Sequence, residues 1–180
     1  MKDRTVVSAI IASALGLLPF APSLSAELKV ERDVRYGPHP RHMMDVYWKA
    51  EYKEAPIVFT IHGGGFKNGS KGYCNKDMQD LYMSKGCIVV SPNYRLMKQG
   101  SSKTTSECDL DVAMTVAHMQ ANAKTFGGDP QKIISTGASA GGHISAQIAY
   151  RKKWDWPTEA KHKPETVSYT HLTLPTSDLV

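Results

Sequence analysis

The most informative stretch of the sequence runs Lys132-Ile133-Ile134-Ser135-Thr136-Gly137-Ala138-Ser139-Ala140-Gly141. Its first half is a short apolar run, typical of a strand buried on both faces of a sheet. Its second half is a Gly-x-Ser-x-Gly pentapeptide, and the pattern of residues 141–150 is helical. A serine on a sharp turn between such a strand and a helix projects its hydroxyl from the sheet edge. We therefore predict that Ser139 is a nucleophile and that Gly137 and Gly141 let strand and helix approach closely. The alternative is a glycine-rich turn without chemistry.

A second glycine run follows an earlier buried strand. Residues 56–61 form a continuous apolar run, and His62-Gly63-Gly64-Gly65-Phe66 comes directly after it. Glycines let backbone N–H groups point at a developing oxyanion, and such donors contribute about 3–4 kcal/mol to the transition state of acyl transfer. The two glycine motifs together favour an acyl-transfer site over an inert turn.

The remaining pattern predicts an α/β protein without internal repeats. Strands are expected at 29–35, 43–47, 56–61, 87–91 and 132–136, and helices at 73–85, 109–126 and 141–150. After two N-terminal strands, strands and helices alternate, which predicts a mostly parallel sheet with helices on both faces. Ser106 and Asp109 resemble a capping box at the start of the second helix, Gly127-Gly128 should end it, and Asp129-Pro130 should form a turn.

Four segments resemble the α/β-hydrolase esterases related to hormone-sensitive lipase and to bacterial feruloyl and acetyl-xylan esterases (BD-FAE-like). They are His62–Lys71 (HGGGFKNGSK), Ser91–Leu96 (SPNYRL), Asp111–Ile133 with its GGDP turn, and Gly137–His143 (GASAGGH). The resemblance covers about residues 43–150 in family order and implies an α/β-hydrolase fold.

The resemblance also implies roles for single residues. Ser139 would be the nucleophile, and the N–H groups of Gly64, Gly65 and Ala140 would form the oxyanion hole. His62, followed by Gly63, would order the loop and would not be the general base.

Four other polar residues are interpreted as structural. His143 lies one helical turn after Ser139 and should point away from its hydroxyl. Asp111 is expected to be a cap or a partner of Arg95, Asp129 a turn residue and His118 a surface or interface residue.

The partners of the nucleophile are not visible in the sequence. A serine nucleophile needs a base and an orienting acid, which in this fold follow it in the order Asp or Glu, then His. The later candidates are Glu159, His162, Glu165 and His171, and neither histidine follows a recognisable strand. We therefore expect the C-terminal part of the domain to be missing, the sheet to end at the nucleophile strand with an apolar edge uncovered, and the chain to be nearly inactive.

Both ends of the chain are expected to lie outside the domain. Residues 1–26 have the basic start, apolar middle and small-residue end of a secretory signal peptide, which predicts a secreted or periplasmic protein. A membrane anchor is the alternative, although the apolar run is shorter than the ~20 residues of a spanning helix. Residues 167–180 show neither helical nor strand period, and 167–176 resemble one reading frame of a transposase mosaic-end sequencing adapter. Residues 27–166 would then be the natural part of one hydrolase domain.

Composition limits the classes of partner. The chain has 180 residues, of which 41% are hydrophobic and 22% charged, with a net charge of +5 that is not gathered into a basic run. Binding to nucleic acid and stable insertion into a membrane are therefore not expected. No residue spacing resembles a metal site, and no organic cofactor is implied. Of the three cysteines, Cys87 opens an apolar run and should be buried, which leaves Cys74 and Cys108 as a candidate disulfide.

The sequence thus predicts a serine carboxylic-ester hydrolase that acts on short-chain, acetyl or feruloyl esters, either small or linked to glycans. An arylformamidase or peptidase would use the same machinery on another bond. A non-catalytic binding module on the same fold is the third hypothesis.

Overall fold

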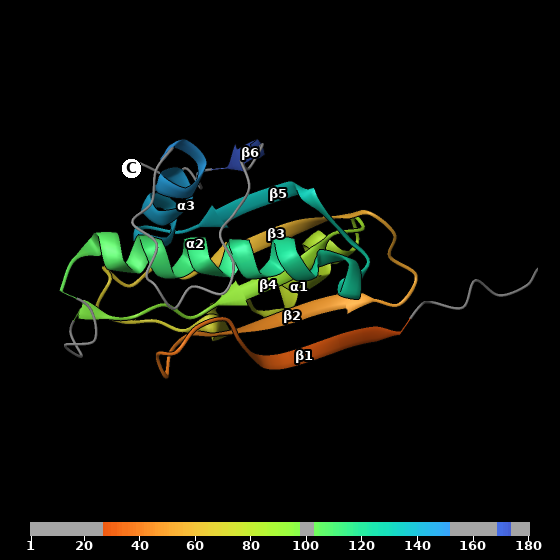
Figure 1. Cartoon of the computed structure of the whole chain (residues 1–180). Helices are drawn as coiled ribbons and strands as arrows, with labels where there is room; N and C mark the ends of the chain where they lie inside the picture. The colour runs from red at the N-terminus through yellow and green to blue at the C-terminus, as the bar shows by residue number, and fades with distance from the viewer. Residues whose placement is uncertain (1–26, 98–102, 152–168, 174–180) are drawn as a thin grey trace, which may run out of the picture.

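A single sheet organises the protein (Figure 1). The computed structural model describes residues 27–97, 103–151 and 169–173, so the predicted signal peptide lies outside the described residues. The six strands lie in the order β1-β2-β4-β3-β5-β6. Strand β2 is antiparallel to both β1 and β4, whereas β3 is parallel to β4 and β5, and β5 to β6. The strands are β1 (Leu28–Arg35), β2 (Met43–Lys49), β3 (Ala55–Ile61), β4 (Ile88–Pro92), β5 (Gly128–Gly137) and β6 (Tyr169–Thr173).

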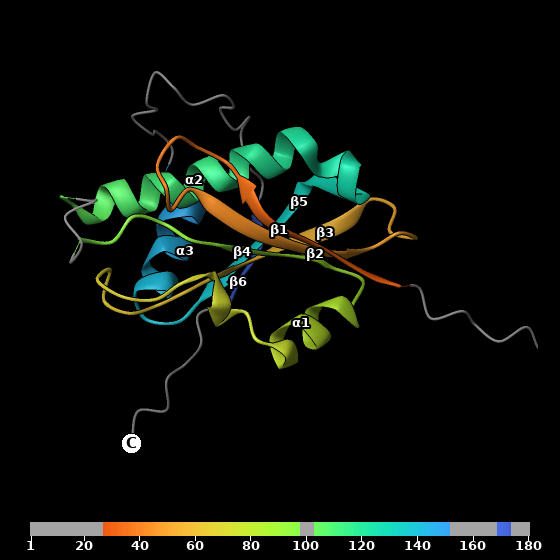
Figure 2. The same cartoon turned by 90° about the horizontal axis from the view of Figure 1, so that it is seen from below.

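Helices cover both faces of this sheet, as the sequence predicted. Figure 2 shows α2 on one face and α1 on the other. Helix α3 packs against β5 and against α2. The helices are α1 (Lys76–Met83), α2 (Thr105–Asn122) and α3 (Ala140–Tyr150), with short 3₁₀ turns η1 (Lys71–Tyr73) and η3 (Ala123–Phe126). The predicted α/β architecture with a mostly parallel sheet is confirmed.

Successive side chains of a strand point to opposite faces of the sheet, and this divides the core into two clusters. In β4, Ile88 and Val90 belong to the large cluster that includes side chains of α2 and α3. Val89, which lies between them, packs with Tyr47 and Met83 in the smaller cluster beside α1. A strand that buries both of its faces needs a continuous apolar run, because successive side chains point to opposite sides.

The capping box of α2 lies two residues before the predicted one. Thr104 Oγ1 accepts a hydrogen bond from the N–H of Glu107 at 3.3 Å, and Glu107 Oε2 accepts one from the N–H of Lys103 at 2.6 Å. The prediction of Ser106 and Asp109 was wrong because the same spacing occurs twice, and Asp109 is a buried residue of the helix interior. Helix α2 runs directly into η3, and the predicted terminal glycine caps η3, where Gly127 has φ 74°.

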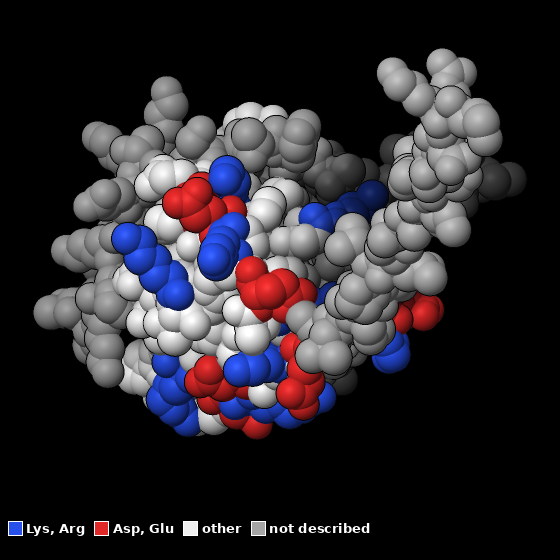
Figure 3. Space-filling view, turned by 90° about the vertical axis from the view of Figure 1, so that its right-hand side faces the viewer, with Lys and Arg blue, Asp and Glu red and all other residues white. Residues whose placement is uncertain are grey.

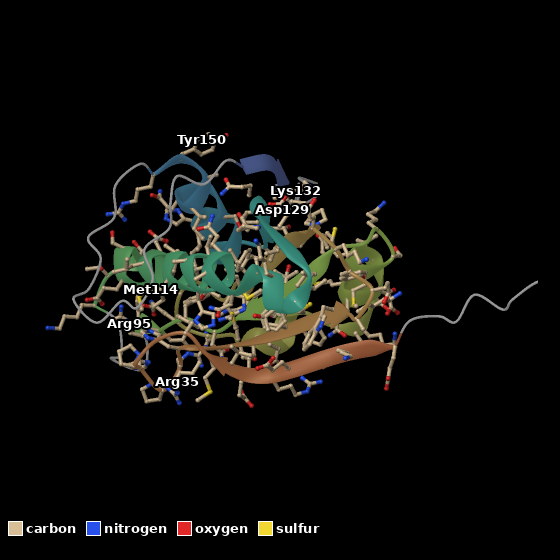
Figure 4. The ribbon with its side chains drawn as sticks, turned by 45° about the vertical axis from the view of Figure 1, so that its right-hand side comes forward. Arg35, Arg95, Met114, Asp129, Lys132 and Tyr150 are labelled. Atoms are coloured by element: carbon tan, nitrogen blue, oxygen red, sulfur yellow. The ribbon has the colours of Figure 1, made fainter. Side chains whose placement is uncertain are left out.

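The predicted Asp129-Pro130 turn is a bulge inside β5. Ala55 pairs with Gly128 and Ile57 with Ile133, so the residues between Gly128 and Ile133 have no regular partner in β3. Asp129 accepts a hydrogen bond from the N–H of Gln131 at 2.9 Å and lies 3.1 Å from Lys132 Nζ (Figure 4). The turn residues therefore bend the strand rather than precede it.

The expectation that the sheet ends at β5 with an uncovered edge was wrong, and residues 169–173 form a strand although no strand period was found there. These residues form β6 and pair in parallel with β5, Ile134 opposite His171 and Thr136 opposite Thr173. Ladder pairing uses backbone groups, and tyrosine and threonine favour strands, so a short segment can pair without a clear apolar period. The predicted adapter origin of 167–180 stays a prediction.

The candidate disulfide does not form. All three cysteines are buried, and none of them forms a disulfide; burial was predicted for Cys87. Cys74 belongs to the core cluster beside α1, whereas Cys108 belongs to the cluster of α2. The sheet lies between the two clusters and keeps these thiols apart.

Charges are mixed on the face seen in Figure 3, where Lys and Arg lie among Asp and Glu. Among the described residues, none of the helices has the length and apolar character to cross a membrane.

Candidate active site

Ser139 occupies the strained turn between β5 and α3. Its backbone has φ 54° and ψ −118°, a region that non-glycine residues rarely adopt. A Cβ at Gly137 would lie 2.5 Å from the carbonyl oxygen of Ile61, and one at Gly141 would lie 2.1 Å from the same oxygen. Only glycine fits at either position, so the pentapeptide can turn against the end of β3.

The turn and the glycine loop meet in one open cavity of about 490 Å³. Ile61 pairs with Gly137 in the parallel ladder, so the segments that follow β3 and β5 leave the sheet at the same edge. Contact is close, since a Cβ on Gly63 would be 2.7 Å from the carbonyl oxygen of Ala138. The cavity is lined by His62, Gly63, Gly64, Gly69, Ser70, Tyr73, Ala138 and Ser139.

The glycine loop has a backbone that presents N–H groups. Gly64 and Gly65 have φ of 102° and 59°, and the carbonyl of Gly64 accepts hydrogen bonds from Lys67 and Asn68 at 3.0 and 3.1 Å. Within the described residues, nothing accepts a hydrogen bond from the N–H of Gly64 or Gly65. Of the predicted oxyanion residues, Gly64 lines the cavity. Gly65 and the buried Ala140, the first residue of α3, are not in the lining but directly follow the lining residues Gly64 and Ser139 in the chain.

His62 packs beneath the loop. Its ring stacks on Tyr94 with centroids 4.1 Å apart, and Nδ1 lies 2.8 Å from the carbonyl oxygen of Gly63. Burial lowers the pKa of His62 to about 4, so the ring is neutral near neutral pH and donates its single N–H to that oxygen. Gly69 closes over the ring, where a Cβ would lie 2.4 Å from Nδ1.

Arg41, which the sequence did not single out, ties the loop to β4. Its Nε donates to the carbonyl of Tyr94 at 2.6 Å, and Nη2 donates to the carbonyl of Gly69 at 2.9 Å. One guanidinium therefore fixes the chain after β4 against a wall of the cavity.

Lys71 anchors the far end of the glycine loop. Its Nζ lies 2.6 Å from Asp45 and 3.1 Å from Asp33, and Asp45 is buried. Burial opposes the charge, but the hydrogen bonds that Lys71 donates to Asp45 and Asp33 hold the pKa of Lys71 above its usual value. The Lys71 carbonyl accepts from Ser91 Oγ at 2.7 Å, which joins the loop to β4.

Asp111 is a structural carboxylate. Arg95 holds it with Nη2 at 2.7 Å and Nε at 3.0 Å, which confirms the predicted pairing, and His42 Nε2 lies 3.1 Å away. Its burial would raise the pKa, but hydrogen bonds from His42 and Arg95 hold it below its usual value. Figure 4 shows Arg95 beside α2, from which Asp111 comes. Asp111 does not line the cavity.

Of the other predicted polar residues, His143 and His118 also lie outside the cavity lining that the structure describes. His143 packs edge-on against Phe66 at 5.6 Å between centroids and lies 3.8 Å from the Asp109 carboxylate. His118 is half-buried in α2, and His171 belongs to β6. The candidate residues Glu159, His162 and Glu165 lie outside the described residues. No cluster of three potential metal ligands occurs in the described part of the chain.

Comparison with known proteins identifies the family. The BD-FAE family model matches residues 44–171. The chain belongs to the BD-FAE family. Solved structures agree with this membership: esterase B from Lactobacillus rhamnosis, inhibited by a tributyrin phosphonate, has a TM-score of 0.59 at 25% identity, over 68% of this chain and 40% of that one. The α/β-hydrolase fold expected from the sequence is thereby confirmed.

Curated relatives of this BD-FAE protein are also esterases by name. Esterase LipC of Mycobacterium tuberculosis is 32% identical over 64% of this chain and 28% of its own length. Isoprenylcysteine alpha-carbonyl methylesterase ICME of Arabidopsis thaliana is 32% identical over 73% of this chain and 30% of its own length. Versiconal hemiacetal acetate esterase of Dothistroma septosporum is 34% identical over 77% and 40%. The chain spans about three tenths of the length of the first two relatives.

Proposed function

We propose that this chain carries the nucleophile and oxyanion hole of a serine carboxylic-ester hydrolase. The observation that carries the proposal is the position of Ser139, on a strained turn that shares a cavity with the glycine loop. The names of the family's relatives support ester hydrolysis as the reaction.

In the proposed reaction, Ser139 Oγ attacks the acyl carbonyl carbon and gives its proton to a base. The oxyanion receives hydrogen bonds from the N–H groups of Gly64, Gly65 and Ala140, and the positive end of the α3 dipole adds to them. The alcohol leaves with a proton, and water then hydrolyses the acyl-enzyme. This route needs no metal or organic cofactor.

The base and the acid are proposed to come from outside the described residues. In the described lining the one imidazole is His62, and its pKa of about 4 and its bond to the Gly63 carbonyl make it a poor base. We therefore propose that ester hydrolysis by this chain depends on a base and an acid that the described residues do not supply. Short acyl groups are the proposed substrates, in keeping with the acetate esterase among the relatives.

The test uses nitrophenyl acetate and locates the acetyl group by mass spectrometry. We expect acetylation at Ser139, faster when imidazole is supplied as a base, and none at this position in Ser139→Ala. Ser135, a buried serine in β5, the strand that precedes the turn, is the internal control. Acetyl groups spread over surface residues without preference for Ser139 would contradict the proposal.

A second arm separates the alternatives. Acetyl nitroanilide and a formamide are offered beside the ester. If the natural bond were an amide, the first would acetylate Ser139, or the second formylate it, faster than the ester acetylates it. Rapid, repeated turnover of the ester by the unaided chain, lost in Ser139→Ala, would confirm the serine mechanism and show that the chain supplies its own base.

A further inference from the structure

We propose that Tyr94 is a positioning residue for the oxyanion hole, because its hydroxyl, together with the His62 ring, holds the two carbonyls that precede the Gly64 N–H and so sets the tilt of that peptide. The inference rests on the proposed function, since it concerns the donor that would stabilise the oxyanion.

The first step is the hydroxyl itself. Tyr94 is fully buried, and its hydroxyl lies 2.9 Å from the carbonyl oxygen of His62 and 3.4 Å from that of Gly63. The hydroxyl therefore donates mainly to the His62 carbonyl and, at the longer distance, to that of Gly63. His62 Nδ1, at 2.8 Å, adds a second donor to the Gly63 oxygen.

The second step follows from peptide geometry. In a planar trans peptide the C=O and the N–H point in opposite directions. A Gly63 carbonyl held toward Tyr94 and His62 therefore turns the N–H of Gly64 away from them. Gly64 lines the cavity with Ser139, so this N–H faces the space where an oxyanion would form.

The third step is the need for such a restraint. Gly64 and Gly65 both have positive φ, and glycine backbones have little rotational preference of their own. Without an external donor on the carbonyl side, the Gly63–Gly64 peptide could rotate and take its N–H out of the cavity. The stacked rings of Tyr94 and His62 occupy the side from which the carbonyl is held.

The fourth step is that Tyr94 is itself held rigidly. Arg41 Nε donates to its carbonyl at 2.6 Å, and the N–H of the next residue, Arg95, donates to Asp111 at 2.8 Å. The hydroxyl therefore has a fixed origin at the end of β4, the strand next to β3.

The test compares Tyr94→Phe with Tyr36→Phe in the full chain. Tyr36 is a matched control, because it is also buried and its hydroxyl also donates to a backbone carbonyl, that of Asn93, without touching the glycine loop. Carbonyl and amide chemical shifts of Gly63 and Gly64 report the peptide tilt. The rate of Ser139 acetylation by nitrophenyl acetate reports the oxyanion hole.

We expect Tyr94→Phe to move the Gly63 carbonyl and Gly64 amide resonances and to slow acetylation about tenfold, less than the loss of a whole oxyanion donor. Tyr36→Phe should leave both readouts at wild-type values. Unmoved resonances in Tyr94→Phe would overturn the inference whether or not Ser139 is acetylated, and so would moved resonances with an unchanged rate.

The two proposals fail in different ways. If the resonances move but wild-type Ser139 is never acetylated, the proposed function and the positioning role built on it both fail, and only the peptide restraint stands. Should Tyr94→Phe not fold, the wild-type Gly63 carbonyl shift decides: a value typical of a carbonyl without hydrogen bonds overturns the inference.

Discussion

Ser139 stands out at the residue scale because its backbone conformation is costly. Residues held in sparsely populated regions of φ and ψ cost of order 1–3 kcal/mol each. The close packing of Gly137 and Gly141 against the end of β3 offsets this cost, because it holds the turn in the strained conformation. The hydroxyl is therefore presented by the scaffold rather than by the preferences of serine itself.

This strain can be measured with two variants that both lack the hydroxyl. Ser139→Gly should be more stable than Ser139→Ala by about 1 kcal/mol, because glycine accepts a positive φ and gives back part of the gain as unfolded-state entropy. Urea unfolding of both proteins checks the difference. An alanine variant as stable as the glycine variant would show that the turn is unstrained.

At the scale of elements, the turn that carries Ser139 packs directly against the end of β3, where the glycine loop begins. The carbonyl of Ile61, at the end of β3, lies where side chains on Gly137 and Gly141 would project. Strand, turn and helix can therefore meet only if both positions lack a Cβ.

Adding one methyl group to this contact should be expensive. Gly141→Ala is expected to cost about 3 kcal/mol or more, even though alanine favours helices, because the new Cβ would overlap a backbone oxygen that cannot move freely. Gly72→Ala is the control, since the nearest atom to its new Cβ is Ser70 Oγ at 3.4 Å. Its unfolding free energy should change by less than about 0.5 kcal/mol. Equal effects of the two changes in a denaturant titration would contradict this account.

Local sequence patterns predicted most strands and helices, but they could not predict contacts between residues far apart in the chain. The Ser139 turn and the His62 loop were found because glycines and apolar runs are adjacent in the sequence. The contacts of Arg41 with Tyr94 and Gly69 join residues far apart in the chain, and no periodic sequence pattern predicts such contacts. Strand β6 was missed for a related reason: it forms by pairing with β5, and its own sequence lacks the alternating pattern that would have predicted a strand.

For the molecule as a whole, the neutral burial of His62 links folding to pH. Its pKa falls from 6.5 to about 4 on burial, so the unfolded chain binds a proton between these values and the folded protein does not. Stability from this residue is therefore complete above about 6.5 and is lost as the pH falls toward about 4.

Between about pH 7 and about pH 5, this linkage should remove about 2 kcal/mol from the free energy of unfolding. His62→Gln cannot titrate, so its free energy of unfolding should change less over the same interval, even if its absolute stability is lower. Denaturant unfolding at both pH values, for both proteins, gives the comparison. The same decrease in the two proteins would assign the pH dependence to other groups.

The pairing of β3 with β5 also sets the order of events in folding. Ile61 and Gly137 are more than seventy positions apart, and β4 and α2 lie between them in the chain. Such non-local contacts must overcome loop-closure entropy before they return any stability, so we expect them to form late. Until they form, nothing forces Ser139 out of its relaxed backbone conformation. In a growing or unfolded chain Ser139 would therefore have a relaxed backbone, and the strained turn would form only when β3 and β5 pair.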